Sequence, residues 1–134
     1  MKNSCIVLAD KHQNILEGLR GLLDTMFAGV VMVADQPSLF EALSRIKPKL
    51  AIVDLSLLGG GNLNTVGEFH KQFPEVKFIV LSDYDDPEII DEVMSAGALG
   101  FVLKQHAGTD LFDAIEKVQK GQSFVSPKIK KSGK

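Results

Sequence analysis

The chain has 134 residues, of which 45% are hydrophobic and 24% charged, and its formal net charge is −2. This length and composition predict one soluble globular domain with a single hydrophobic core. The near-neutral charge gives no electrostatic reason to bind nucleic acid, and no apolar stretch approaches the ~20 residues of a membrane span. We therefore expect no direct nucleic-acid binding by this segment and no membrane insertion.

The cysteine content and the first residues predict a cytoplasmic location. Cys5 is the single cysteine, so it forms no intramolecular disulfide and is compatible with a reducing compartment. The first apolar run ends at Asp10, which is too soon for the apolar core of a secretory signal.

Five short apolar runs alternate with segments in which apolar residues recur at helical spacing. Uninterrupted runs of this length are typical of strands buried on both faces of a parallel sheet, and the spacing between them is that of amphipathic helices. In chain order, the pattern predicts a strand at 5–9, a helix over 15–26, a strand at 30–34, a helix over 39–46, a strand at 50–53, a helix over 66–73, a strand at 78–81, a helix over 89–94, a strand at 101–103 and a helix over 111–118.

Proline and glycine positions agree with this pattern. Pro37 and Pro87 stand where helices begin, and Gly97 and Gly121 where helices end. Successive strand–helix units predict an α/β fold, a doubly wound five-stranded parallel sheet with helices on both faces.

Four reactive side chains follow these strands. Asp10, Asp54, Ser82 and Lys104 each stand at the end of an apolar run. Right-handed crossovers bring the C-terminal ends of parallel strands to one edge of the sheet, where ligands bind in such folds. Two carboxylates, a hydroxyl and an ammonium at one edge predict a site that handles a phosphoryl group.

With these residues in this order, the chain resembles the receiver domain of bacterial two-component response regulators, from Ile6 to about Pro127. The segment from Val7 to His12 is most similar to LuxR-type (NarL-like) transcription regulators. Val53-Asp54-Leu55 resembles the phosphoacceptor strand end, and Val80-Leu81-Ser82 the strand that carries a conformational Ser or Thr. The segment 97–104 resembles the part that bears the lysine of the family.

The resemblance implies a receiver (flavodoxin-like) fold with strand order 2-1-3-4-5, and a role for each strand-end residue. Asp54 is then the phosphoacceptor, whose carboxylate attacks the phosphorus of a phosphohistidine or a small phosphodonor. Lys104 pairs with the phosphoryl oxygens, Ser82 rotates to hydrogen-bond one of them, and the aromatic switch residue Phe101 moves inward with Ser82.

The resemblance also implies a Mg²⁺ site formed by Asp10, Asp54 and the backbone carbonyl of Ser56, which neutralises the charge of the donor. Lys11 departs from the family because it stands where a second metal-binding acid is usual. An ammonium cannot ligate Mg²⁺. If Lys11 reaches inward, it is a charge substitute for the metal, since one charge pair at about 4 Å is worth about 4 kcal/mol at an effective dielectric near 20. Otherwise its long stem turns into solvent.

A second departure follows Asp54. The chain has Ser56-Leu57-Leu58-Gly59 where the family usually has a Met-Pro or similar pair, so the proline turn that places the carbonyl of residue 56 is missing. The three histidines, His12, His70 and His106, lack metal-ligand spacing and are interpreted as surface residues.

The leading hypothesis is a receiver domain over residues 1–122 with a linker or tail over 123–134. A sensor histidine kinase phosphorylates Asp54, and a helix-turn-helix output domain absent from this chain binds DNA and regulates transcription. Self-catalysed phosphotransfer and autodephosphorylation are the only chemistry expected, so the chain is not a conventional enzyme. The family resemblance also implies a homodimer through the face of helix 86–97, strand 100–103 and helix 109–120.

Two alternatives remain open. Lys11 favours a pseudo-receiver, an interaction or dimerisation module that never takes phosphate. A flavodoxin-like nucleotide-binding protein is the third hypothesis, although the segment from Asp10 to Gln13 lacks the glycine that a phosphate loop needs there.

Overall fold

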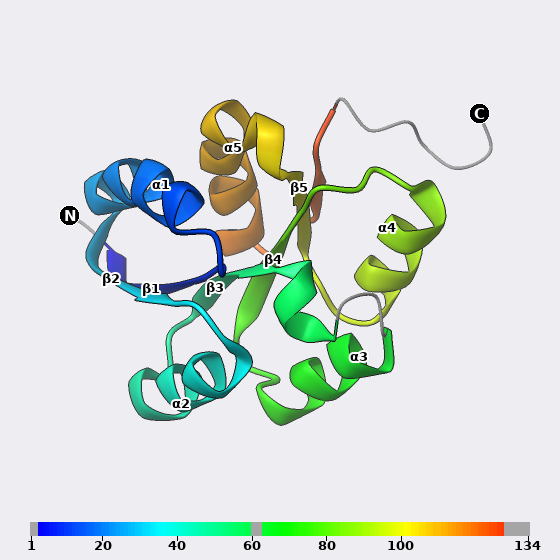
Figure 1. The fold of residues 1–134 in the computed structure, drawn as a ribbon, viewed down its shortest axis with the longest axis horizontal. Helices are drawn as coiled ribbons and strands as arrows, with labels where there is room; N and C mark the ends of the chain where they lie inside the picture. The colour runs from blue at the N-terminus through cyan, green and yellow to red at the C-terminus, as the bar shows by residue number, and fades with distance from the viewer. Residues whose placement is uncertain (1–2, 60–62, 128–134) are drawn as a thin grey trace.

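The computed structural model describes residues 3–59 and 63–127. A parallel sheet carries helices on both faces (Figure 1), which confirms the predicted fold class. The elements are β1 (Asn3–Ala9), α1 (Gln13–Met26), β2 (Phe27–Val33), α2 (Gln36–Ile46), β3 (Leu50–Asp54), η1 (Leu55–Leu58), α3 (Leu63–Gln72), β4 (Lys77–Ser82), α4 (Pro87–Ser95), β5 (Gly100–Leu103), η2 (Lys104–His106), α5 (Ala107–Gln119) and β6 (Phe124–Val125). None of the helices in these ranges is long and apolar enough to cross a membrane.

The strand order is β2-β1-β3-β4-β5-β6, and every pair is parallel. The predicted order of the first five strands is therefore confirmed. Every residue of β3 and β5 is buried, as expected for strands covered on both faces. One hydrophobic layer contains buried residues of α2, α3 and α4, and the other contains those of α1 and α5. Figure 1 shows these two groups of helices on opposite sides of the sheet.

Local signals fix several element ends as predicted. α2 and α4 have a proline in the first turn, and each begins after an aspartate whose side chain accepts a backbone hydrogen bond, Asp35 and Asp86 respectively. The N–H of Ser38 holds the pKa of Asp35 below its usual range. Beyond the C-termini of α4 and α5, Gly97 and Gly121 adopt positive φ angles of 127° and 81°, which glycine tolerates best.

Other element ends differ from the expected ones. β2 begins at Phe27, directly after the last residue of α1, rather than at residue 30. α4 (Pro87–Ser95) is longer than the helix predicted over 89–94 and shorter than the 86–97 given for the dimer face. α5 begins at Ala107 rather than 109 because η2 leads straight into it. Residues 60–62 and residues 128–134 of the predicted linker or tail lie outside the described residues.

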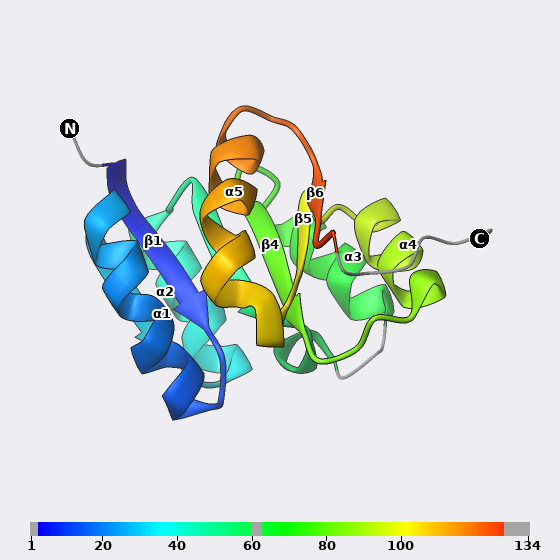
Figure 2. The same cartoon turned by 90° about the horizontal axis from the view of Figure 1, so that it is seen from above.

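A sixth strand, β6, was not predicted. The N–H of Phe124 donates to the carbonyl of Leu99 (2.9 Å), and that of Ser126 to the carbonyl of Phe101 (3.0 Å). The N–H of Leu103 in turn donates to Oγ of Ser126 (3.1 Å). Figure 2 shows β6 beside β5, on the side of the sheet away from β1. The boundary at residue 122 stays a prediction, while hydrogen bonds to the sheet continue through Ser126.

Candidate functional site

The four strand-end side chains lie buried at the C-terminal edge of the sheet. Asp10 follows β1, Asp54 ends β3, Ser82 ends β4 and Lys104 follows β5. Their exposed fractions are 0%, 3%, 1% and 8% in that order. Buried charges require partners, and three of these residues provide them for one another.

Lys104 joins the two carboxylates. Its Nζ lies 3.0 Å from Oδ2 of Asp10 and 3.1 Å from Oδ2 of Asp54. Burial alone lowers the pKa of this ammonium, but the contacts with Asp10 and Asp54 outweigh burial, so that the pKa is raised above 10.5. The ammonium is therefore charged at neutral pH. Two carboxylates and one ammonium leave a net charge of −1, which still attracts a cation.

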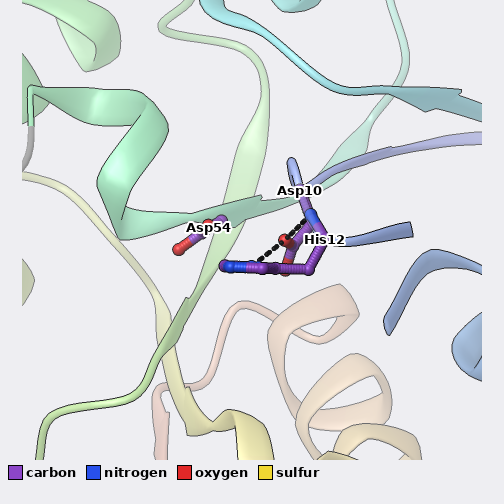
Figure 3. A group of neighbouring side chains, drawn as sticks. All are labelled: Asp10, His12 and Asp54. Atoms are coloured by element: carbon purple, nitrogen blue, oxygen red, sulfur yellow. Dashed lines mark hydrogen bonds and ion pairs between the residues drawn. The ribbon is translucent and has the colours of Figure 1, made fainter. Parts of the chain in front are cut away.

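His12 belongs to this site, and its interpretation as a surface residue was incomplete. Its side chain is 54% exposed, yet Nδ1 lies 3.0 Å from Oδ1 of Asp10 and 3.2 Å from Nζ of Lys104. Figure 3 shows the imidazole reaching from Asp10 toward Asp54. The backbone N–H of His12 also donates to Oδ1 of Asp10 (2.8 Å), a turn in which an aspartate side chain bonds the backbone two residues on. That short spacing from a strand-end acid was the available sequence signal.

Asp54 is held by the residue that lies two positions after it. The Ser56 hydroxyl donates to Oδ2 of Asp54 (2.7 Å), and the Ser56 N–H lies 3.2 Å from Oδ1. The sequence indicated the carbonyl of Ser56 as the functional group. The hydroxyl and the N–H of Ser56 are the groups in contact with Asp54, and they orient its carboxylate.

Ser82 and Phe101 lie nearby in different environments. The Ser82 hydroxyl accepts a hydrogen bond from the N–H of Tyr84 (2.9 Å) and lies 3.2 Å from the Tyr84 carbonyl. Phe101 is fully buried in the layer of α2, α3 and α4. The hydroxyl is thus bound to its own loop, while the aromatic ring already points into the core.

A pocket of about 510 Å³ opens above the acids, and its lining includes Lys11, His12, Asp54 and Ser82. Lys11 is exposed, and in the described part of the chain it forms no ion pair with Asp10 or Asp54. The ammonium between the carboxylates is that of Lys104. This arrangement agrees with the interpretation in which the stem of Lys11 turns into solvent.

The site residues fit a divalent cation. Asp10, His12 and Asp54 each offer a ligand atom, and these atoms lie within 4.8 Å of one another. Oδ2 of the fully buried Asp10 has the Lys104 ammonium, 3.0 Å away, as its charged partner in the described part of the chain. A buried carboxylate oxygen in that state is suited to a cation.

The fold and this edge define a receiver domain. The response regulator receiver domain model matches residues 6–116, so the chain belongs to that family. A receiver domain is not a conventional enzyme. Among its relatives, the oxygen regulatory protein NreC of Staphylococcus haemolyticus is 32% identical over 127 residues, which cover 92% of this chain and 58% of NreC. The LuxR-type resemblance is confirmed by such relatives.

Solved structures of the regulator RcsB from Salmonella enterica serovar Typhimurium are similar throughout. Its isolated receiver domain with the phosphomimetic BeF₃⁻ gives a TM-score of 0.83 at 30% identity, covering 96% of both chains. RcsB bound to promoter DNA gives 0.82 at 30% identity, covering 96% of this chain and 65% of RcsB. The first curated relatives are longer proteins, of which this chain spans 53–62%.

Proposed function

We propose that this chain is a working receiver in the cytoplasm, in which Asp54 accepts a phosphoryl group from a phosphohistidine of a sensor kinase. The observation that carries the proposal is the pairing of the buried Asp54 carboxylate with Lys104 beside Asp10. An Asp54 oxygen attacks phosphorus, and the bond between phosphorus and the histidine nitrogen breaks. The electron pair of that bond leaves with the imidazole of the kinase.

Lys104 has a charge that suits both states of the site. Before transfer it pairs with the carboxylates, and after transfer it pairs with the phosphoryl oxygens. Asp10, Asp54 and the carbonyl of Ser56 would hold Mg²⁺, which would supply positive charge to neutralise the phosphoryl oxygens. The Ser56 hydroxyl holds Asp54 in a fixed orientation toward the pocket.

The readout proposed for phosphorylation begins at Ser82. Its hydroxyl exchanges the Tyr84 contacts for a hydrogen bond to a phosphoryl oxygen, which moves the loop before α4. Phe101 is already buried, so the loop rather than the ring is the element that changes. A two-state equilibrium of this kind is biased by charge at Asp54. The output is a helix-turn-helix domain outside this chain, reached through residues 123–134, with dimerisation through α4, β5 and α5.

The proposal is tested by intact-mass spectrometry after incubation with a small phosphodonor, with and without Mg²⁺. The expected result is a single phosphoryl adduct that requires the metal and is absent from Asp54→Asn. A matched control is Asp83→Asn, which changes an exposed acid at the same pocket and should leave the adduct unchanged. An adduct that survives Asp54→Asn would contradict the assignment of the phosphoacceptor.

A second candidate function is that of a pseudo-receiver. Lys11 at the usual acid position and the missing proline turn at Ser56-Leu57-Leu58-Gly59 favour it. In this case no adduct forms under any condition, and the domain acts through its surfaces alone. Lys11→Asp should then restore Mg²⁺ binding; an unchanged Mg²⁺ affinity in calorimetry would count against Lys11 as the cause.

A further inference from the structure

We propose that Nδ1 of His12 is a metal ligand that replaces the acid missing at Lys11, so that the site prefers a first-row transition ion such as Mn²⁺ to Mg²⁺. The inference rests on the proposed function in one respect, since it concerns the metal that assists phosphotransfer. It goes further in assigning a nitrogen ligand and a different class of metal.

The first support is the place that the Lys104 ammonium occupies. Oδ2 of Asp10, Oδ2 of Asp54 and Nδ1 of His12 lie 3.0, 3.1 and 3.2 Å from its Nζ. Three potential ligands, from the turn after β1 and from the end of β3, thus surround one positive charge. The ammonium stands in for a cation, and the imidazole nitrogen contacts it at nearly the same distance as the carboxylates do.

The second support is the spacing of the ligand atoms. Ligands at about 2.1 Å from an octahedral ion are about 3.0 Å apart at neighbouring corners. Oδ1 of Asp10 and Nδ1 of His12 are 3.0 Å apart. This spacing, which is that of a hydrogen bond in the structure, would also suit two neighbouring ligands of one octahedral ion. The hydrogen bond from the His12 N–H to Asp10 fixes the backbone that carries the ring.

The third support is the chemistry of the ligand set. Mg²⁺ requires oxygen donors, and the position of the usual second acid holds the exposed Lys11. Imidazole suits Zn²⁺, Fe²⁺ and Ni²⁺, and carboxylate suits Mn²⁺ as well as Mg²⁺. Replacing a carboxylate by an imidazole removes an oxygen donor from Mg²⁺ and offers transition ions a nitrogen donor. The residues on this edge thus favour a transition ion.

Binding of the ion has a consequence for Lys104. A bound ion would take the place of the ammonium among the three ligands. Lys104 would then be available to pair with the phosphoryl oxygens.

The test measures the binding of Mn²⁺ to the full chain in the absence of any phosphodonor. Binding is detected by electron paramagnetic resonance, as the loss of the signal of the free ion. Pulsed measurements on the wild-type protein should show modulation from one directly bound ¹⁴N nucleus. His12→Ala should abolish this modulation and weaken Mn²⁺ binding by at least about tenfold, since even indirect partners of a metal contribute 10–100-fold. Mg²⁺ affinity, measured by competition, should change far less.

His106→Ala is the matched control, because His106 lies at the same edge in η2 outside the set of ligand atoms; it should change nothing. Bound Mn²⁺ without ¹⁴N modulation would overturn the proposal whatever the variants do. Equal weakening of Mn²⁺ and Mg²⁺ in His12→Ala would also overturn it, because His12 would then only position Asp10. The phosphorylation assay tests the proposed function separately. If the wild-type protein forms a Mg²⁺-dependent adduct but His12→Ala binds Mn²⁺ as tightly as wild type does, the receiver function stands and only the inference about His12 fails.

Discussion

Nζ of Lys104 lies 3.1 Å from Oδ2 of Asp54 although β3 and β5, which position them, are not neighbours in the sheet. β4 lies between these strands, so the Lys104 side chain reaches over the end of β4 to Asp54 and on to Asp10. The ammonium thereby connects three strands at the edge where the chemistry takes place. Its removal has consequences for stability as well as for phosphotransfer.

Lys104→Met should destabilise the domain, because it leaves two buried carboxylates without their shared counter-charge. Removing one partner of a buried ion pair costs roughly 3–5 kcal/mol, and urea unfolding at neutral pH measures this loss. The loss should shrink on addition of a divalent cation, which would supply a counter-charge to the two carboxylates. Lys49→Met, at an exposed lysine, is the control and should be close to neutral.

The same ion pair predicts a dependence on alkaline pH. Because the pKa of Lys104 is raised in the folded protein, its contribution to stability is fully present below the unfolded-state value of 10.5. It is lost as the pH rises through the higher folded-state pKa. The difference in unfolding free energy between wild type and Lys104→Met should therefore be constant from neutral pH to about 10.5 and fall above it. A difference that falls well below this pH would show that another group controls it.

Gly100→Ala should destabilise the sheet through a clash. A Cβ at Gly100 would lie 2.8 Å from Cγ1 of Ile79, a fully buried neighbour in the β4–β5 register. Overpacking of this kind costs roughly 1–3 kcal/mol. Gly108→Ala is the contrast, because its Cβ meets nothing within 4 Å, and an alanine in the helix should stabilise by up to about 1 kcal/mol. Thermal unfolding of both variants checks the opposite signs.

Ser126→Ala should reveal how firmly the chain beyond α5 is attached. The substitution removes the acceptor for the buried N–H of Leu103, and an unsatisfied buried donor costs roughly 1–3 kcal/mol. Ser123→Ala, three residues earlier at an exposed position, serves as control and should be nearly neutral. A chain ending at Gln122 should lose more stability than one ending at Pro127; equal stability would support the boundary predicted at residue 122.

The fold was predictable because strand burial and helix periodicity leave strong, repeated signals. The four strand-end residues were predictable for the same reason, since sheet topology places the ends of parallel strands together. β6 was not predictable, because a strand of two residues is too short to show periodicity. It forms by pairing with the edge of β5 that β4 leaves open. The start of β2 was missed because Ala28 and Gly29 interrupt the apolar run.

The position of the His12 side chain in the site was not predictable from periodicity either. Residues after a strand have directions set by individual backbone angles, and at His12 these are φ −94° and ψ 106°. That conformation brings the ring back over Asp10 instead of away from the sheet. The sequence also did not show which lysine places its ammonium between the two acids, because this depends on the direction in which each side chain extends. Lys104 extends across β4, whereas Lys11, adjacent to Asp10 in sequence, is exposed.

The short β6 makes the two borders of the sheet unequal. At one border, β6 has two residues, and at the other, β2 has seven, paired on one side with β1. An edge strand with many unpaired peptide groups is a template for the addition of another strand, and a short edge strand limits such addition. A second chain or an extended peptide that lengthens this sheet would therefore align along β2, at the opposite edge of the sheet from β6.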